Sequence, residues 1–219
     1  MVQTKIYEIG PGIQKDAFET IIQETAEALL NGKTAAFPTE TVYGIGASIF
    51  NENAVLKIYQ IKGRPPEKPL SILISSAGDM EKTASEIPNS ARLLAEKFWP
   101  GPLTMILRKK EEISDKVTAG KATVGLRVPA HPVPLALVQL TGPLACPSAN
   151  LSGADEPKSA KDVLKDLDGQ VDILIDGGKT ALGVPSTIID LTAVPPKILR
   201  KGGLDIIEIK KVIGEVQNE

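Results

Sequence analysis

Three segments of the sequence combine a proline with small polar side chains at an expected strand end. They are Pro38-Thr39-Glu40-Thr41, Pro147-Ser148-Ala149-Asn150 and Pro185-Ser186-Thr187. Proline has no backbone N–H to donate to a sheet ladder, so regular strand pairing is expected to stop at each of them. The hydroxyl and amide groups there are suited to binding a polar ligand.

Basic side chains also occur near glycine or proline at expected element ends, namely Lys62, Arg64, Arg127 and Arg200, and Lys68 lies in the same basic region as Lys62 and Arg64. Ligands of open α/β sheets bind outside strand ends, so the cations and hydroxyls are expected to meet in one cleft. Such a cleft suits an anionic substrate that carries phosphates. For Lys62 and Arg64 a structural alternative stays open, because the helix dipole favours cations at a helix C-terminus.

The first of these segments continues into a stretch of alternating hydroxyls, Thr39, Thr41 and Tyr43, that is closed by Gly44 and Gly46. Glycine lets backbone N–H groups approach a ligand closely, so we expect a polar, ligand-facing wall here. An ordinary turn after a strand is the alternative.

The sequence lacks the sets of residues that several common catalytic mechanisms require. The sequence shows no Ser-His-Asp arrangement, no Cys/His cluster for zinc and no paired carboxylates with a clear acid/base assignment. The single histidine, His131, has no visible partner, and the single cysteine, Cys146, is expected to be a small buried core residue. The chemistry is therefore expected to rest on positioning and charge stabilisation, as in phosphoryl or nucleotidyl transfer.

Composition favours one large α/β domain over residues 1–219, with 42% hydrophobic and 24% charged residues. A formal net charge of −2 counts against general nucleic-acid binding. No apolar run approaches the roughly 20 residues that span a bilayer, and the N-terminus lacks a signal-peptide pattern. We therefore expect a cytosolic protein with no membrane partner.

Helical and strand patterns alternate often but not strictly, which predicts a twisted sheet of mixed parallel and antiparallel strands flanked by helices. Strands are expected at 5–9, 34–37, 70–74, 103–107, 123–128, 144–146, 171–175, 188–191 and 198–200. Helices are expected at 15–31, 53–61, 88–98, 133–140, 161–167 and 205–216.

Taken together, the segments resemble the YrdC-like domain of threonylcarbamoyl-AMP synthases. The blocks that carry the resemblance, in order along nearly the whole chain, are 37–46, 62–65, 68–70, 99–104, 127–129, 147–150, 176–178, 185–187 and 199–200. The resemblance implies a YrdC-like fold with a concave basic cleft. It also implies that L-threonine, bicarbonate and ATP give threonylcarbamoyl-AMP and pyrophosphate, for modification of the adenosine beside the anticodon in some tRNAs.

Residue roles follow from the same resemblance. It implies a basic catalytic pair, Lys62 and Arg64. It implies nucleotide contacts from Arg64, Lys68, Thr123, Ser148, Asn150 and Arg200. It implies a threonine site formed by Thr41, Arg127 and Ser186, with the backbone near Cys146. Mg²⁺ is expected to be held through ATP phosphates and water rather than by protein ligands.

The sequence departs from the family pattern at Leu73, where many relatives have a histidine that reaches threonine. The chain also ends near residue 219, so it is either the short form or the N-terminal domain of the longer form. A tRNA contact and a downstream threonylcarbamoyl-transferase complex are expected partners. Two alternatives stay open: a non-catalytic tRNA-binding or double-stranded RNA-binding module, and a carbamoyl-transfer domain of hydrogenase maturation.

Overall fold

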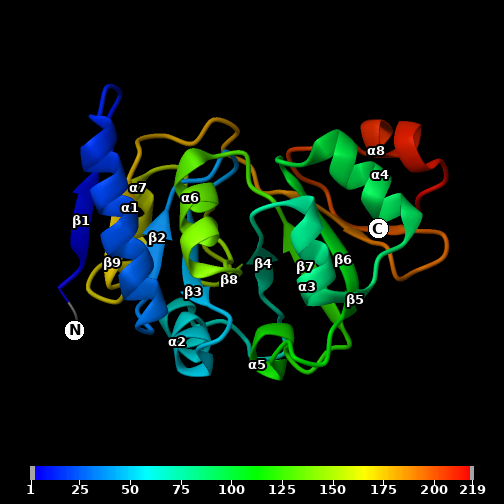
Figure 1. The fold of residues 1–219 in the computed structure, drawn as a ribbon, viewed down its shortest axis with the longest axis horizontal. Coiled ribbons are helices and arrows are strands. Elements are labelled where there is room, and N and C mark those ends of the chain that lie inside the picture. The colour runs from blue at the N-terminus through cyan, green and yellow to red at the C-terminus, as the bar shows by residue number, and fades with distance from the viewer. Residues whose placement is uncertain (1–2, 218–219) are drawn as a thin grey trace.

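The computed structural model describes residues 3–217, which form an eleven-stranded sheet with helices on its faces (Figure 1). The strands follow the order β1-β9-β2-β3-β8-β4-β7-β6-β10-β11, and β5 pairs with β6. Parallel pairs such as β2 with β9 and antiparallel pairs such as β6 with β7 both occur. The predicted mixed sheet is confirmed.

The strands are β1 (Lys5–Glu8), β2 (Ala35–Phe37), β3 (Gly44–Ser48), β4 (Ser71–Leu73), β5 (Ala84–Glu86), β6 (Leu103–Lys109), β7 (Thr123–Arg127), β8 (Leu144–Ala145), β9 (Ile173–Asp176), β10 (Thr187–Asp190) and β11 (Lys197–Arg200). The helices are α1 (Lys15–Leu30), α2 (Glu52–Lys62), α3 (Met80–Thr83), α4 (Asn89–Phe98), α5 (Asp115–Thr118), α6 (Pro132–Thr141), α7 (Ala160–Leu167) and α8 (Ile206–Ile213), with a 3₁₀ turn at Ala77–Asp79. None of the helices within residues 3–217 has the length and apolar character that crossing a membrane would need.

Helix α2 shows how the local sequence sets where a helix begins and ends. The Asn51 side chain accepts a hydrogen bond from the Ala54 N–H at 3.0 Å, which caps the helix start. Gly63 ends the helix with φ 55°, a left-handed conformation that glycine adopts without a Cβ penalty. Lys62 is the last helical residue, and Arg64 follows the cap.

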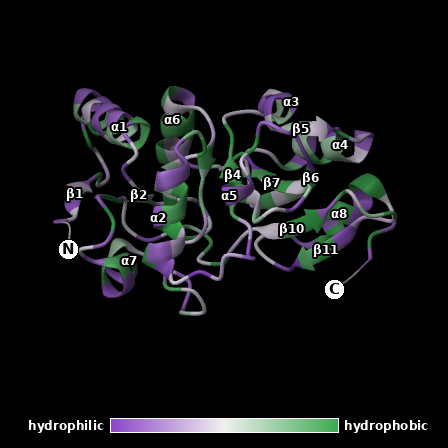
Figure 2. Ribbon diagram, turned by 90° about the horizontal axis from the view of Figure 1, so that it is seen from below, coloured by the Kyte–Doolittle hydropathy of each residue, from purple (hydrophilic) through white to green (hydrophobic). Residues whose placement is uncertain are grey.

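The β9-β2-β3 part of the sheet is buried on both faces, because successive side chains of a strand point to opposite sides. Ala35 and Phe37 of β2 pack in a cluster with α1 and α6, whereas Ala36 packs on the other side with α2. Figure 2 shows α1 and α6 on one side of β2 and α7 on the other. Apolar side chains on both faces explain why these strands read as continuous hydrophobic runs.

In the β4-β7-β6-β10 part of the sheet, one face packs against the core and the opposite face carries a pocket. Met105, Leu126 and Ile189 face the core cluster that α4 and α8 complete. The residues that alternate with them point to the opposite face. Leu73, on β4, joins the α1–α6 cluster and also lines a pocket, so the pocket opens on that face of the sheet beside α6.

Strand β3 was not expected. The sequence predicts a ligand-facing turn through Gly44 and Gly46, but residues 44–48 pair antiparallel with β2 and β8. A Cβ on Gly46 would lie 2.7 Å from the Phe37 ring, and one on Gly44 would lie 2.5 Å from the Cys146 Sγ. These glycines therefore serve close packing between strands. The short elements β5, α3 and α5 were also missed.

We expect Asp172 to be a major contributor to stability. Its carboxylate accepts hydrogen bonds from the Thr34 N–H at 2.8 Å and the Lys57 Nζ at 2.6 Å, with 7% of the side chain exposed. Asp172→Ala should lower the free energy of unfolding by about 3 kcal/mol, because it leaves buried donors without an acceptor. Urea denaturation measures the change.

Lys33→Ala is the matched control, because Lys33 approaches the same carboxylate only at 3.8 Å and is 58% exposed. Lys33→Ala should lower the free energy of unfolding by less than about 1 kcal/mol. Burial raises the pKa of Asp172, but hydrogen bonds from Lys57 and Thr34 outweigh it and hold this pKa below its ordinary value. The stabilisation should therefore be lost as pH falls through the folded-state pKa. Equal decreases in the free energy of unfolding for Asp172→Ala and Lys33→Ala would contradict this account.

Candidate functional site

The floor of the pocket is built from alternate residues of neighbouring strands. Ser71 of β4 pairs with Gly125 of β7, which pairs in turn with Ile106 of β6. A Cβ built on Gly125 would lie 3.0 Å from the Ile106 side chain and 3.3 Å from the Ser71 Oγ. The three positions therefore share one face, and the absence of a side chain at Gly125 keeps the middle of the floor open.

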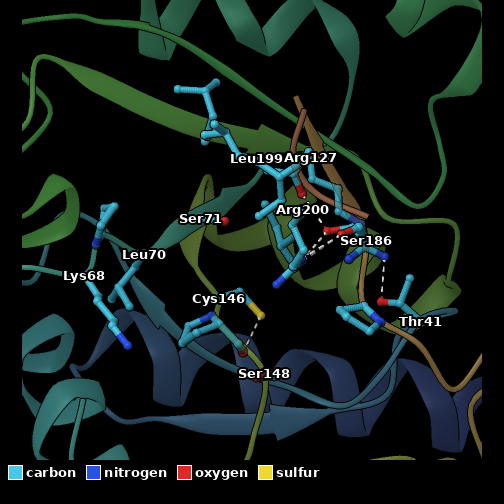
Figure 3. Close-up of a pocket in the computed structure, with 18 of the residues that line it drawn as sticks. Thr41, Lys68, Leu70, Ser71, Arg127, Cys146, Ser148, Ser186, Leu199 and Arg200 are labelled. Carbon is cyan, nitrogen blue, oxygen red and sulfur yellow. Dashed lines mark hydrogen bonds between the residues drawn. The ribbon is translucent and has the colours of Figure 1, made fainter. Parts of the chain in front are cut away.

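The walls come from segments far apart in the sequence. The pocket has a volume of about 310 Å³, within the size range of small-molecule sites. Figure 3 shows Lys68 on one side, with Thr41 and Ser186 on the other and Arg200 between them. The predicted site residues that line it are Thr41, Arg64, Lys68, Thr123, Arg127, Cys146, Ser148, Ser186 and Arg200.

Backbone carbonyl oxygens hold two of the lining arginines. Arg64 donates from Nε to the Lys68 carbonyl at 3.0 Å and from Nη2 to the Pro69 carbonyl at 2.9 Å. Arg200 donates from Nε and Nη2 to the Ser186 carbonyl at 3.0 and 2.8 Å. A carbonyl satisfies an N–H group without cancelling its charge, so both guanidinium groups keep a full positive charge for a ligand.

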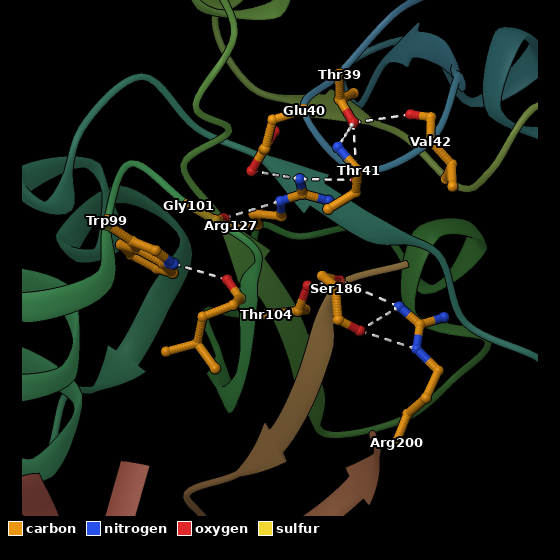
Figure 4. Close-up of polar contacts among 11 residues, drawn as sticks. Thr39, Glu40, Thr41, Val42, Trp99, Gly101, Thr104, Arg127, Ser186 and Arg200 are labelled. Atoms are coloured by element: carbon orange, nitrogen blue, oxygen red, sulfur yellow. Dashed lines mark hydrogen bonds and ion pairs between the residues drawn. The ribbon is translucent and has the colours of Figure 1, made fainter. Parts of the chain in front are cut away.

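Ser186 is held from two directions, as Figure 4 shows in part. Its hydroxyl accepts a hydrogen bond from Arg200 Nη2 at 3.1 Å and lies 2.8 Å from the Thr104 hydroxyl. Thr104 also lines the pocket. The sequence analysis did not single out Thr104, although it lies inside one of the blocks that carry the family resemblance.

Arg127 is the most enclosed of the lining cations, with 9% of its side chain exposed. Its Nε donates to the Gly101 carbonyl at 3.2 Å, and its Nη2 donates to the Thr41 hydroxyl at 2.9 Å. Nη2 also lies 2.7 Å from a carboxylate oxygen of Glu40 (Figure 4). Arg127 is therefore the lining cation that is paired with an acidic side chain.

Two predicted site residues do not line the pocket. Lys62 is 2% exposed, and its Nζ donates to the carbonyls of Ser148 and Asn150 at 2.6 and 2.5 Å. Asn150 is also buried, and its Oδ1 accepts a hydrogen bond from the Ser148 hydroxyl at 2.6 Å. Lys62 and Asn150 therefore support the loop that carries Ser148 rather than the pocket wall, and their direct contact with substrate stays a prediction.

Cys146 lines the pocket, but its thiol is not set up as a nucleophile. Burial raises the pKa of the thiol to about 12, despite the positive charges of Arg127 and Lys62 nearby. A thiol that stays protonated at neutral pH is a weak nucleophile. The expectation of a buried core residue is therefore corrected, because Cys146 is only partly buried and lines the pocket wall.

The hydroxyls of Thr39 and Tyr43, expected in a polar wall, point elsewhere. Thr39 bonds the Val42 carbonyl at 2.7 Å and the Thr41 hydroxyl at 2.8 Å. Tyr43 donates to the Gly178 carbonyl at 2.7 Å. Of the three alternating hydroxyls, only Thr41 faces the pocket, and the other two fix the loop.

The donor set does not form a protein-held metal site. Every lining residue is apolar, a hydroxyl or thiol residue, glycine or a cation, and none is Asp or Glu. Across residues 3–217, no three His, Cys, Asp or Glu side chains are grouped closely enough to hold an ion. This chemistry suits phosphates rather than a bare divalent cation.

Comparison with known proteins decides the family. The family model described as "Telomere recombination", Sua5/YciO/YrdC, matches residues 27–202. The chain belongs to the Sua5/YciO/YrdC family.

Relatives in this family share much of the sequence. A threonylcarbamoyl-AMP synthase from Pyrococcus abyssi is 50% identical over 197 residues, covering 90% of this chain and 58% of the relative. Another, from Bacillus subtilis, is 45% identical over 197 residues, covering 89% and 57%. A structure described as P. abyssi Sua5 complexed with L-threonine has a TM-score of 0.94 at 47% identity, covering 99% of this chain and 63% of that chain. The chain therefore spans a little over half the length of these relatives.

Burial of Lys62 should make the folding stability of this Sua5/YciO/YrdC member depend on pH. Burial, with Arg64 nearby, lowers the pKa of Lys62 from its ordinary 10.5 to about 8. Between these values the folded protein has released a proton that the unfolded chain still holds. The contribution of Lys62 to stability should therefore increase as pH rises from 8 to 10.5.

Lys62→Met removes this titration while keeping an apolar stem of similar length. The difference in unfolding free energy between unaltered protein and Lys62→Met should shift in favour of the unaltered protein from pH 7 to pH ~9.5. Urea denaturation at both pH values measures it. A difference that does not change with pH would show that Lys62 titrates normally.

Proposed function

We propose that this protein is an L-threonylcarbamoyladenylate synthase, a nucleotidyltransferase that joins L-threonine, bicarbonate and ATP into threonylcarbamoyl-AMP. The observation that carries the proposal is the pocket itself. Four cations, Arg64, Lys68, Arg127 and Arg200, converge there with the hydroxyls of Thr41, Thr104, Thr123, Ser148 and Ser186. The P. abyssi Sua5 structure described as complexed with L-threonine supports the same assignment.

The threonine end of the pocket is formed by Arg127 with Thr41 and Ser186. The Nη1 group of Arg127 has no acceptor among the described residues, so the guanidinium binds the carboxylate of the amino acid through this charge-assisted donor. The hydroxyls of Thr41 and Ser186 then exchange hydrogen bonds with its amine and side-chain hydroxyl. Leu73 lines the pocket, so it offers the substrate an apolar contact.

The nucleotide end is formed by Arg64, Lys68 and Arg200, with hydroxyls from Thr123 and Ser148. Burial lowers the pKa of Arg200; the charge of Glu156 opposes this shift, and the charges of Arg127 and Arg64 add to it. Repulsion among these cations is relieved when a polyanion enters. ATP phosphates supply that polyanion.

The reaction proceeds in two steps. The neutral threonine amine attacks the carbon of bicarbonate, forming a C–N bond and releasing water, which leaves a carbamate. A carbamate oxygen then attacks the α-phosphorus of ATP, and the bond to the bridging oxygen breaks as pyrophosphate leaves. Arg64, Lys68 and Arg200 stabilise the negative charge that moves toward the leaving group.

Mg²⁺ belongs to the proposal only as an ion that arrives with ATP. The pocket offers no carboxylate ligand, so we assign the ion to phosphate oxygens and water and give no protein residue a metal role. Contact with tRNA, delivery to a downstream threonylcarbamoyl-transferase complex and a cytosolic location remain part of the same proposal.

Incubation with ATP, bicarbonate and each amino acid in turn tests the activity. Pyrophosphate release should require L-threonine and bicarbonate together, because the carbamate forms before the nucleotide is attacked. Mass spectrometry should detect threonylcarbamoyl-AMP. Binding of tRNA without any turnover would favour the RNA-binding alternative, and turnover that needs carbamoyl phosphate in place of threonine would favour carbamoyl transfer.

Arg127→Lys tests the carboxylate assignment while leaving a cation beside Glu40. Lysine keeps the charge but loses the planar guanidinium that holds Gly101 and Thr41 and still has Nη1 to offer, so KM for L-threonine should rise by roughly 10-fold while KM for ATP stays nearly constant. Steady-state pyrophosphate release measures both constants. Arg108→Lys, at an exposed arginine of β6, is the control and should change neither. An equal rise in both constants would show that Arg127 does not face threonine.

A further inference from the structure

Glu40 is a buried carboxylate that stands directly behind the pocket. It does not line the cavity, and its side chain is 11% exposed. Its Oε1 lies 2.7 Å from Arg127 Nη2, and its backbone carbonyl accepts the Leu182 N–H at 2.9 Å. Neither carboxylate oxygen has a well-aligned hydrogen-bond donor within residues 3–217. The interaction with Arg127 is therefore mainly one of charge.

No other cation within residues 3–217 forms an ion pair with Glu40. His131 is near enough to feel its charge, but burial lowers the pKa of His131, so the imidazole is neutral at pH 7. The His131 Nδ1 accepts a hydrogen bond from the Val133 N–H at the start of α6. The negative charge of Glu40 thus acts on Arg127.

The other lining cations are held differently. Carbonyl oxygens bind Arg64 and Arg200, and neither forms an ion pair with a carboxylate among the described residues. The same holds for Lys68. The charge of Glu156 also acts on Arg200, but from beyond ion-pair distance. The Arg64 and Arg200 end therefore carries a larger net positive charge than the Arg127 end, where the ion pair with Glu40 brings the charge close to neutral.

Arg127 still has hydrogen-bonding capacity. Its Nε and Nη2 groups are engaged by Gly101, Thr41 and Glu40, but its Nη1 has no protein acceptor within the described part of the chain. Nη1 is therefore left to donate to a ligand in the pocket, from a guanidinium whose charge is already balanced. Such a site favours a ligand with no net charge, such as a zwitterionic amino acid, over a multiply charged anion.

We propose that Glu40 is a specificity-determining residue that positions Arg127 and neutralises it, so that this end of the pocket accepts an amino-acid carboxylate and rejects phosphate-like anions. The inference rests on the proposed function for the identity of the amino acid. Four cations in one pocket would otherwise give a triphosphate or pyrophosphate two competing binding positions. Glu40 removes the second position and keeps polyanions at the Arg64 and Arg200 end.

Inhibition by sulfate tests the proposal through Glu40→Gln, which keeps the shape of the side chain and removes its charge. Sulfate should become a competitor of L-threonine with an inhibition constant ~10-fold lower than in the unaltered protein, because a unit charge close to the bound anion is lost. Its inhibition constant against ATP should change less than about twofold. Unchanged competition against threonine, or an equal change against ATP, overturns the proposal.

Two further variants separate this role from a general charge effect. Glu67→Gln removes one negative charge from an exposed residue beside Lys68, and sulfate inhibition should stay as in the unaltered protein. Glu40→Asp keeps the charge and should retain the weak competition between sulfate and threonine. A Glu67→Gln effect as large as that of Glu40→Gln overturns the proposal.

Crystals of the unaltered protein grown with sulfate give a test that needs neither activity nor a folded variant. Sulfate should occupy the Arg64 and Arg200 end and leave Arg127 free of it. A sulfate bound to Arg127 in the unaltered protein overturns the proposal. The absence of threonine-dependent turnover would instead refute the proposed function, and the sulfate positions would still report on Glu40.

Discussion

Hydrogen bonds from buried and partly buried cations to backbone carbonyl oxygens are the interaction on which this site depends. Arg64, Arg200 and Lys62 are all held in this way, and Arg127 is held partly so. An acidic partner at each position would satisfy the same N–H groups but cancel the charge that attracts an anion. Carbonyl dipoles meet the hydrogen-bonding requirement and leave the charge available.

This constraint explains why proline recurs around the site. The carbonyls come from residues 68–69, 101, 148, 150 and 186, and Pro69, Pro102, Pro147 and Pro185 lie among or beside them. Proline fixes φ and ends strand pairing, so the carbonyl next to it is not used by the sheet and can point at a side chain. The sheet then sets the spacing between loops, because strands β4, β7, β6 and β10 are neighbours.

Much of the site could be predicted because proline and strand ends are local signals. The convergence of Thr41, Ser148, Ser186 and Arg200 follows from several strands ending at one edge. The buried position of Lys62 also had a signal that was not used: it lies four residues after Ile58, on the buried face of α2. Its aliphatic stem continues the apolar stripe of the helix.

The rest could not be predicted, because the decisive contacts are long-range. Strand β3 contains Gly44 and Gly46, which weaken a strand signal, and only the contacts with Cys146 and the ring of Phe37 explain why side chains are excluded there. Glu40 lies in the loop after β2 and Arg127 is the last residue of β7, so the two meet only when β2 and β7 occupy the same sheet. A carboxylate beside two threonines looks like part of a polar turn until its partner is known. The charge balance of the pocket is therefore a property of the fold, since one acidic side chain, placed behind one arginine, makes two chemically similar ends different.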